Sequence, residues 1–127
     1  GATRCHYDEF ALLKKQFGDR LVIVAFPCNQ FSGQEPKSDA QIAEFTKRKG
    51  FDGVVMSKCK VNGSGASAVF DFLKVKSKTG GVMWNFYKFV VSPCGTEVTR
   101  FTTAATPLTM AKHIAETLRK WDERNND

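Results

Sequence analysis

The apolar run LVIVAF, residues 21–26, is flanked by segments with helical periodicity and stops abruptly at Pro27. A short run rich in β-branched residues indicates a strand that is buried on both faces. Because a helix is expected before it, the strand is predicted to be parallel to its neighbour in a unit of alternating strands and helices. The chain is therefore expected to build a sheet with helices packed against it.

Four segments have apolar residues that recur three and four positions apart, which is typical of helices. They are residues 7–17, 39–49, 65–76 and 107–123. Ser38 and Gln41 have the spacing of a capping box at the start of the second helix. The residues expected to face the core from these helices are Phe10, Leu13, Phe17, Ile42, Phe45, Val69, Phe72, Leu73, Leu108, Ile114 and Leu118.

Residues 51–63 are expected to be extended, and residues 87–91 and 97–101 are expected to pair as a hairpin around SPCGT. The proline and glycine of SPCGT favour a turn. The order helix, strand, helix, irregular strand, helix, hairpin, helix predicts an α/β fold with a mixed central sheet flanked by helices. No repeat or linker interrupts this order, so residues 1–127 are expected to form a single domain.

The net charge of +6 favours anionic partners, such as acidic small molecules or anionic lipid surfaces. No RNA-binding motif with interleaved aromatic residues is present, so nucleic acid is not expected as a partner. The four cysteines are scattered without a C-x-x-C pair, which favours a reducing compartment. His6 and His113 lack zinc-like spacing, so no metal site is expected. Both histidines are expected on the surface or a helix face, without a role as acid or base.

Three motifs occur in order along the chain. They are FPCNQFSGQEP at residues 26–36, KCKVNG at 58–63 and WNFYKFVV at 84–91. In this order and at this spacing they closely resemble the glutathione peroxidase family, and the similarity extends from Tyr7 to the C-terminal helix. The resemblance implies a thioredoxin-like fold and the reduction of hydroperoxides by thiol donors, as part of the response to oxidative stress.

The resemblance also places the family's peroxidatic residue, a selenocysteine or cysteine, directly before Gly1. GAT at residues 1–3 is similar to the end of the loop that carries this residue in selenocysteine members. The family's first strand would then also lie upstream of Gly1. On this interpretation the protein is a selenoprotein, and residues 1–127 alone are expected to be inactive.

By the same resemblance, Gln34, Trp84 and Asn85 are the catalytic partners of the peroxidatic residue. Amide and indole N–H groups donate hydrogen bonds and add no negative charge, so they suit a selenolate or thiolate that must stay anionic. Taken singly, each has an ordinary structural alternative: bonding to nearby backbone, packing in the core and supporting a turn, respectively. Cys28 is expected to be a small buried residue, because free cysteine is often found in cores.

Two-cysteine members of the family carry a resolving cysteine in the helix after FPCNQF, where this chain has Thr46. Cys59 matches a structural position of the family pattern, so an internal disulfide is not expected. Two external thiols, most simply glutathione, are therefore predicted to reduce the oxidised enzyme. Glutathione is expected as a co-substrate, and no cofactor is expected. Cys5 and Cys94 are expected to be oxidation-prone surface thiols.

The short connection before Trp84 resembles the monomeric branch of the family that reduces phospholipid hydroperoxides. Lys74, Lys76 and Lys78 beside it are candidates for binding glutathione carboxylates or lipid head groups, and a solvated basic face is the alternative. Met83 stands where lipid-type members often have lysine, which departs from the pattern. A monomer in the cytoplasm or mitochondria is expected.

A second class stays open at this point: a non-catalytic, peroxidase-derived module with a structural or binding role. Without the family's first strand, an exposed sheet edge would need a cover, which a partner strand could supply. The residue encoded before Gly1 separates the two classes, because selenocysteine or cysteine there supports the enzyme. A disulfide reductase is disfavoured by the lack of a C-x-x-C pair.

Overall fold

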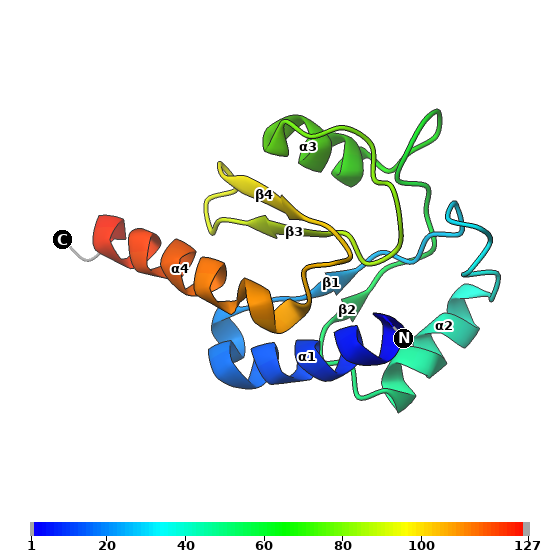
Figure 1. The fold of residues 1–127 in the computed structure, drawn as a ribbon, viewed down its shortest axis with the longest axis horizontal. Coiled ribbons are helices and arrows are strands. Elements are labelled where there is room, and N and C mark those ends of the chain that lie inside the picture. The colour runs from blue at the N-terminus through cyan, green and yellow to red at the C-terminus, as the bar shows by residue number, and fades with distance from the viewer. Residues whose placement is uncertain (1, 126–127) are drawn as a thin grey trace.

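The computed structural model describes residues 2–125, in which helices and short strands alternate (Figure 1). The helices are α1 (Ala2–Phe17), α2 (Asp39–Arg48), α3 (Ala68–Ser77) and α4 (Ala111–Asn125), with 3₁₀ turns η1 (Gly18–Arg20) and η2 (Pro107–Met110). The strands are β1 (Val24–Ala25), β2 (Val54–Val55), β3 (Lys88–Val91) and β4 (Val98–Phe101). The predicted α/β class is confirmed. Gly1, beside which the sequence places the peroxidatic residue, lies outside the described residues.

The hairpin of β3 and β4 forms a middle layer, with α3 on one side and α1 and α4 on the other (Figure 1). The strands are antiparallel, and Lys88 pairs with Phe101 at one end. Successive side chains of a strand point to opposite faces. Phe89 accordingly packs on the α3 side, whereas Val90 packs on the side of α1 and α4. The hairpin predicted around SPCGT is confirmed.

Two apolar clusters fill the spaces on either side of this hairpin. The cluster on the α3 side is built on Cys28, Phe31, Val61, Phe70, Leu73 and Val82. The cluster between the hairpin, α1 and α4 is built on Leu13, Met110 and Ile114. The cluster on the α3 side contains residues from both the FPCNQF turn and the segment before Trp84. It therefore packs together motifs that are distant in the sequence.

The predicted inward face of α3 is partly wrong. Leu73 is buried as expected, but its partner is Phe70, while Val69 and Phe72 are exposed. The helix begins after Ser67, whose hydroxyl accepts a hydrogen bond from the Val69 amide. From that start, Phe70 and Leu73 lie three residues apart on the side that faces the hairpin.

The start of the last helical segment also differs from the prediction. Leu108 is exposed and Met110 is buried in its place. The cause is the 3₁₀ turn η2, in which three residues make one turn, so the side chains are rotated relative to an α-helix. The exposed Leu108 backbone amide donates to Glu9 Oε1 of α1 at 2.8 Å. Ile114 and Leu118 pack as predicted.

The strand predicted over residues 21–26 is shorter and less buried than expected. Only Val24 and Ala25 pair, in parallel with Val54 and Val55, which confirms the predicted direction. Val22 is 69% and Val24 44% exposed, so the expectation of a strand buried on both faces is wrong. Among residues 2–125 β1 pairs with β2 alone, and the side chains of Val22 and Val24 remain accessible to solvent.

The start of α2 follows its sequence signal. Ser38 and Gln41 form the predicted capping box: the Gln41 amide donates to Ser38 Oγ at 3.2 Å, and the Ser38 amide donates to Gln41 Oε1 at 3.0 Å. Helix α1 begins at Ala2, five residues before the predicted start at Tyr7.

Within residues 2–125 no helix combines the length and the apolar character that crossing a lipid bilayer requires.

Candidate active site

Two of the three predicted catalytic residues are in direct contact. Asn85 Nδ2 donates a hydrogen bond to Gln34 Oε1 at 2.8 Å, although the two residues are 51 positions apart. Gln34 is presented by a tight turn in which Ser32 and Gly33 both have left-handed backbones, with φ of 53° and 59°. Asn29 Oδ1 closes this turn by accepting from the Glu35 amide at 2.9 Å. The turn therefore fixes the direction in which the side chain of Gln34 points.

Trp84 lies beside this amide pair. Its ring is 6.1 Å from that of Phe31, centroid to centroid, and the residue is 41% exposed. Gln34, Trp84 and Asn85 line one cavity of about 740 Å³, and so do Ala2 and Thr3 at the start of α1. This cavity extends through the core to both apolar clusters, and the amides, the indole and the N-terminal end of α1 each line part of it. Each of these groups can stabilise a negative charge.

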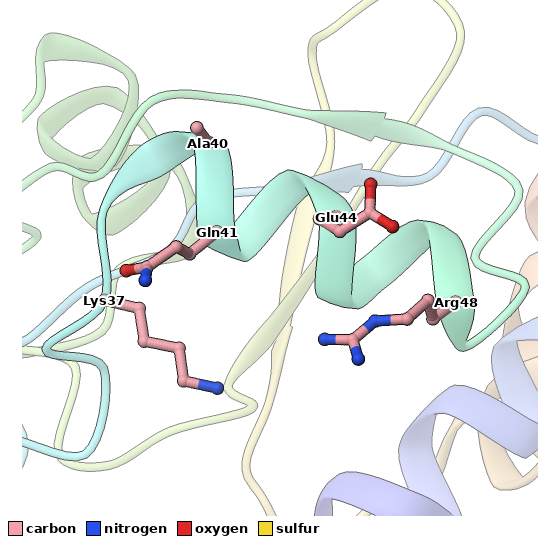
Figure 2. Close-up of a pocket in the computed structure, with 5 residues that line it drawn as sticks. All are labelled: Lys37, Ala40, Gln41, Glu44 and Arg48. Atoms are coloured by element: carbon pink, nitrogen blue, oxygen red, sulfur yellow. The ribbon is translucent and has the colours of Figure 1, made fainter.

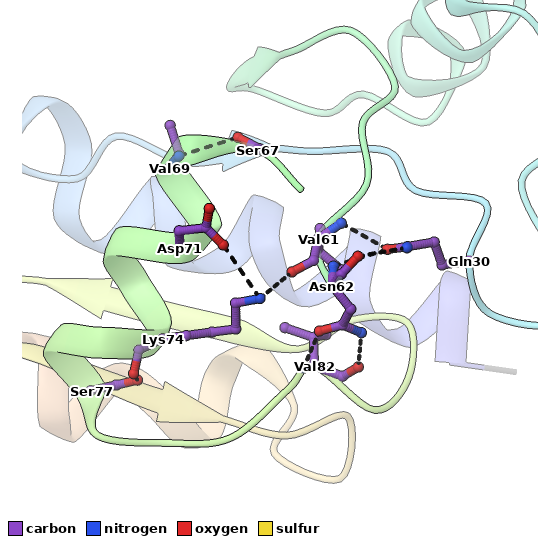
Figure 3. Close-up of polar contacts among 9 residues, drawn as sticks. All are labelled: Gln30, Val61, Asn62, Ser67, Val69, Asp71, Lys74, Ser77 and Val82. Atoms are coloured by element: carbon purple, nitrogen blue, oxygen red, sulfur yellow. Dashed lines mark hydrogen bonds and ion pairs between the residues drawn. The ribbon is translucent and has the colours of Figure 1, made fainter. Parts of the chain in front are cut away.

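A second set of amides, from Gln30 and Asn62, holds the motifs together (Figure 3). Gln30 Oε1 accepts from the Val61 amide at 2.7 Å and the Asn62 amide at 3.1 Å. Gln30 Nε2 donates to the Asn62 carbonyl at 3.0 Å. The Asn62 side chain in turn bonds both backbone groups of Val82, its Oδ1 accepting from the amide at 2.8 Å.

This network holds the backbone of Val82, which lies two residues before Trp84. It therefore fixes the segment that leads into Trp84. It joins the FPCNQF turn, the VNG turn and the segment before WNF, three motifs that lie far apart in the sequence. The sequence motifs taken singly did not identify Gln30 and Asn62 as positioning residues. The available signal was an amide side chain in each turn, because such side chains commonly bond to backbone.

The three predicted donor-binding lysines differ in their surroundings. Lys74 Nζ donates to the Val61 carbonyl at 2.7 Å and lies 3.7 Å from Asp71 Oδ1 (Figure 3). The ammonium group of Lys74 is therefore already paired with groups of the protein itself. Lys76 and Lys78 are exposed. Lys78 forms the left-handed end of α3, with φ of 56°. A role of these residues in binding a thiol donor or a lipid stays a prediction.

The surface expectation for His6 is wrong, because the residue is almost completely buried between α1 and β3. Its ring nitrogens contact the Ala2 carbonyl and the ammonium group of Lys88. The helical pattern placed His6 near the start of a helix but could not show that β3 packs on that side. His113 lies on α4 with its ring edge-to-face to Phe101, at a centroid distance of 5.3 Å, as a helix-face residue.

Cys28 is buried in the α3-side cluster, which confirms its predicted place in the core. Its Sγ accepts from the Gln30 amide at 3.4 Å. Cys59 packs against the same cluster, and burial together with the nearby Cys28 raises the pKa of the Cys59 thiol. Thr46, which occupies the place of a resolving cysteine, is buried and donates its hydroxyl to the Ala43 carbonyl at 2.8 Å.

The two remaining cysteines differ from one another. A hydrogen bond to Glu9 raises the pKa of Cys5, which is half-buried on α1. Cys94 is exposed at the hairpin turn, where hydrogen bonds from Thr96 lower the pKa of its thiol to about 7. The prediction of a reactive surface thiol therefore fits Cys94 better than Cys5.

A shallow hollow of about 310 Å³ lies along α2, away from the residues of the amide pair. It is lined by Lys37, Ala40, Gln41, Glu44 and Arg48. Lys37 and Arg48 extend to the same side of the helix, whereas the Glu44 carboxylate points away from them (Figure 2). The hollow offers two cations on an open surface and contains none of the predicted catalytic residues.

Several known proteins are similar to this chain over most of its length. A glutathione peroxidase 1 of mitochondria from Chlamydomonas reinhardtii is 47% identical over 121 residues, which cover 91% of this chain and 60% of the relative. A glutathione peroxidase-like peroxiredoxin 2 of Saccharomyces cerevisiae is 40% identical, with coverage of 94% and 80%. A protein of Mesembryanthemum crystallinum named a probable phospholipid hydroperoxide glutathione peroxidase is 41% identical, with coverage of 90% and 70%.

Two solved structures share the fold. The crystal structure of Trgpx in apo form has a TM-score of 0.70 at 27% identity, over 91% of this chain and 69% of that one. The crystal structure of T. cruzi GPX1 has a TM-score of 0.66 at 28% identity, over 93% and 71%. Both confirm the thioredoxin-like α/β fold that the motifs implied.

The fold thus places the chain in the thioredoxin-like α/β class. The family model for glutathione peroxidase matches residues 1–74, more than half of the chain. The chain belongs to the glutathione peroxidase family, whose members are oxidoreductases. It spans 60% of the length of the algal relative and 80% of the yeast one.

Proposed function

We propose that this chain is the greater part of a thiol-dependent peroxidase that reduces hydrogen peroxide and organic hydroperoxides. The observation that carries the proposal is the hydrogen bond between Asn85 and Gln34, next to Trp84 in the chain and on a cavity that the first turn of α1 also lines. A selenocysteine or cysteine directly before Gly1 would be attached to the N-terminal end of that helix. There the helix dipole lowers the pKa of a thiol or selenol and favours the anion that attacks.

In the proposed reaction, the selenolate or thiolate attacks the nearer peroxide oxygen, the O–O bond breaks, and the leaving oxygen takes a proton to depart as water or alcohol. The peroxidatic residue becomes a selenenic or sulfenic acid. Gln34, Trp84 and Asn85 stabilise the anion before attack and the developing negative charge on the leaving oxygen. Two molecules of a thiol then restore the residue, with release of one disulfide and one water.

Glutathione is the proposed donor, and it is a co-substrate. The buried threonine at position 46 supports external thiols, since it offers no sulfur for an internal disulfide. Relatives are named both as glutathione peroxidases and as glutathione peroxidase-like peroxiredoxins, so a thioredoxin-type donor is the alternative that the assay must include. No nucleic-acid partner is proposed.

Lipid hydroperoxides are proposed among the substrates, and the enzyme is proposed to act as a monomer. The short segment between α3 and Trp84 and the exposed Lys76 and Lys78 support access for a bulky lipid with an anionic head group. Relatives include a named phospholipid hydroperoxide enzyme. The proposed compartment is the cytoplasm or mitochondria, and two relatives are named as mitochondrial.

The test is a coupled assay on the full-length protein that carries selenocysteine or cysteine before Gly1. Hydrogen peroxide and a phosphatidylcholine hydroperoxide would be the substrates, with glutathione or thioredoxin as donor. Gln34→Ala, Trp84→Phe and Asn85→Ala should each lower kcat/KM for peroxide by about 10²–10³ if the groups stabilise charge in the transition state.

Matched controls are Gln16→Ala on the exposed surface of α1 and Trp121→Phe on α4, both expected to keep full activity. Activity with glutathione that the three site variants lose and the controls keep would support the proposal. A folded full-length protein that reduces no peroxide with either donor would overturn it.

A further inference from the structure

His6 and Lys88 form a buried polar pair between α1 and β3. His6 is 1% exposed and Lys88 is 8% exposed. Lys88 Nζ lies 2.7 Å from His6 Nε2 and also donates to the Ala105 carbonyl. His6 Nδ1 lies 2.8 Å from the carbonyl oxygen of Ala2. Because an ammonium group can only donate, His6 Nε2 must accept, and Nδ1 must carry the ring proton and donate to Ala2. The ring is therefore neutral in this arrangement.

The pair lies directly against the backbone that carries Asn85. The next residue, Phe86, has φ of 59°, a left-handed conformation that bulky residues rarely adopt. The His6 ring stacks on the Phe86 ring, with centroids 4.4 Å apart and planes inclined by 23°. Thr103 Oγ1 donates to the Asn85 carbonyl. A strained corner of this kind persists only where its surroundings hold it in place.

Packing alone does not account for the pair. A buried ammonium loses its hydration, and an apolar side chain of similar volume would avoid that cost. What the ammonium provides is a set of directed hydrogen bonds that connect three segments: α1 through His6, the loop at residues 102–106 through Ala105, and β3 itself. The same loop holds Asn85 through Thr103.

We propose that His6 and Lys88 are positioning residues for peroxide reduction, which hold Asn85 in the orientation that its hydrogen bond to the peroxidatic anion requires. The proposal rests on the peroxidase function proposed above. Neither residue touches the reacting atoms. Both act through the Phe86 corner and the loop at residues 102–106.

Protonation of His6 should release this arrangement. Burial lowers the pKa of His6, and the Lys88 charge acts in the same direction, while the Ala2 carbonyl and Glu9 oppose it. Burial lowers the pKa of Lys88 to about 8, against the opposing charges of Cys5 and Glu9, so the ammonium is still mostly charged at pH 6. A proton on His6 Nε2 would turn this atom into a donor facing the ammonium group of Lys88, which is also a donor, and the hydrogen bond would be lost. Tyr7 is a further titratable neighbour at this corner, with its ring centroid 6.4 Å from that of Phe86.

The sign of the pH effect follows from the lowered pKa of His6. The unfolded chain takes up the proton near the ordinary value of about 6.5, before the folded protein does. The stabilising contribution of the neutral ring is therefore complete above about pH 6.5 and is lost as the pH falls through the pKa of the folded state. Activity that depends on the oriented Asn85 should decline only as the pH falls through the lowered pKa of His6 in the folded state.

The experiment uses the full-length protein with its peroxidatic residue. It follows the ¹H–¹⁵N signals of the Asn85 side-chain amide and kcat/KM for hydrogen peroxide between about pH 5 and 8. His6→Phe keeps a stacking ring but removes the acceptor, and Lys88→Met removes the donor. Both should shift the Asn85 signals and lower kcat/KM about tenfold, with the dependence on thiol concentration unchanged.

His6→Gln keeps an acceptor that does not titrate. It should recover most of the activity lost in His6→Phe and remove the decline in acid. His113→Gln is the matched control and should leave both the Asn85 signals and the pH profile as they are. If Lys88→Met does not fold, the comparison of His6→Gln with the natural protein still decides the matter.

The proposal is overturned if folded His6→Phe and Lys88→Met leave the Asn85 signals and the pH profile unchanged. Failure of the peroxidase function would look different. In that case the natural protein would reduce no peroxide, while the Asn85 amide would still respond to pH and to His6→Phe.

Discussion

The hairpin of β3 and β4 and the parallel pair of β1 and β2 are both rich in β-branched residues but have different surroundings. The hairpin is covered on one face by α3 and on the other by α1 and α4, and its side chains alternate between two apolar clusters. The β1–β2 pair is two residues long, and Val22 and Val24 remain exposed beside it. Burial of a strand is therefore decided by the layers around it, which its own sequence does not specify.

The candidate site joins these two regions. Asn85 leads directly into the covered hairpin, whereas Gln34 follows the open strand through the turn at residues 29–33. The rigid side of the site is thus built by packing, and the other side is built by hydrogen bonds in turns. Substitutions in the two regions should differ in size and in kind.

The largest effect is expected beneath the hairpin. Leu13 is almost completely buried in the cluster that also contains Val90 and Phe101. Leu13→Ala should lower the free energy of unfolding by about 2–5 kcal/mol, because it removes buried methyl groups and leaves a cavity. Val24→Ala, on the open face of β1, should cost less than about 1 kcal/mol. Urea denaturation of the two variants measures the difference, and equal losses would show that the two regions are not distinct.

The next effect tests the part of the site that hydrogen bonds support. Asn62→Ala removes the side chain that bonds both backbone groups of Val82. Leaving those groups without partners should cost about 1–3 kcal/mol in the free energy of unfolding and loosen the segment that leads into Trp84. Thermal unfolding and the Trp84 indole ¹H–¹⁵N signal would report both changes.

The control for this variant is Asn125→Ala. Within the described residues Asn125 donates to one carbonyl, that of Trp121, at the exposed end of α4, and its loss should stay within about 0.5 kcal/mol. If Asn62→Ala were as mild as this control and left the Trp84 signal in place, the network would not be what positions the segment.

Local signals in the sequence predicted local structure well. The capping box at Ser38, the turn SPCGT and the antiparallel hairpin follow from short-range chemistry, and all are confirmed. The exposure of Val24 and Phe72 and the burial of His6 depend on which elements pack together. Periodicity indicates that a helix has an apolar face, but the exact start of the helix and the neighbouring layers decide which residues form it.

The candidate site shows the same limit. The motifs placed Gln34, Trp84 and Asn85 in one group through the family resemblance, and the structure brings Gln34 and Asn85 within hydrogen-bond distance. The supporting residues Gln30, Asn62 and Lys88 stand within the quoted motifs, yet they contact backbone groups or side chains 17 to 82 positions away. A motif identifies residue types but not the distant groups that they contact.

The smallest effect on stability is expected where the hairpin leaves its covering layers, at Cys94. The hydroxyl of Thr96 lies 2.9 Å from Cys94 Sγ, and the pKa of about 7 makes roughly half of this thiol a thiolate at pH 7. Cys94 should therefore react with iodoacetamide faster than Cys5, whose pKa is raised, and faster than the buried Cys28. Below pH 7 its rate should fall about tenfold per unit, as the thiolate fraction falls.

Mass spectrometry of the labelled peptides measures these rates in the natural protein and in Thr96→Val, which removes the hydroxyl donor and should slow labelling of Cys94 several-fold. Cys94→Ser should leave the free energy of unfolding within about 0.5 kcal/mol, because the turn is exposed. Equal labelling of Cys94 and Cys5 at pH 7, or a rate that Thr96→Val does not change, would contradict the assignment of a hydrogen-bonded thiolate. The reactivity of Cys94 would then be that of a thiol in an open loop, independent of the hairpin that holds the turn.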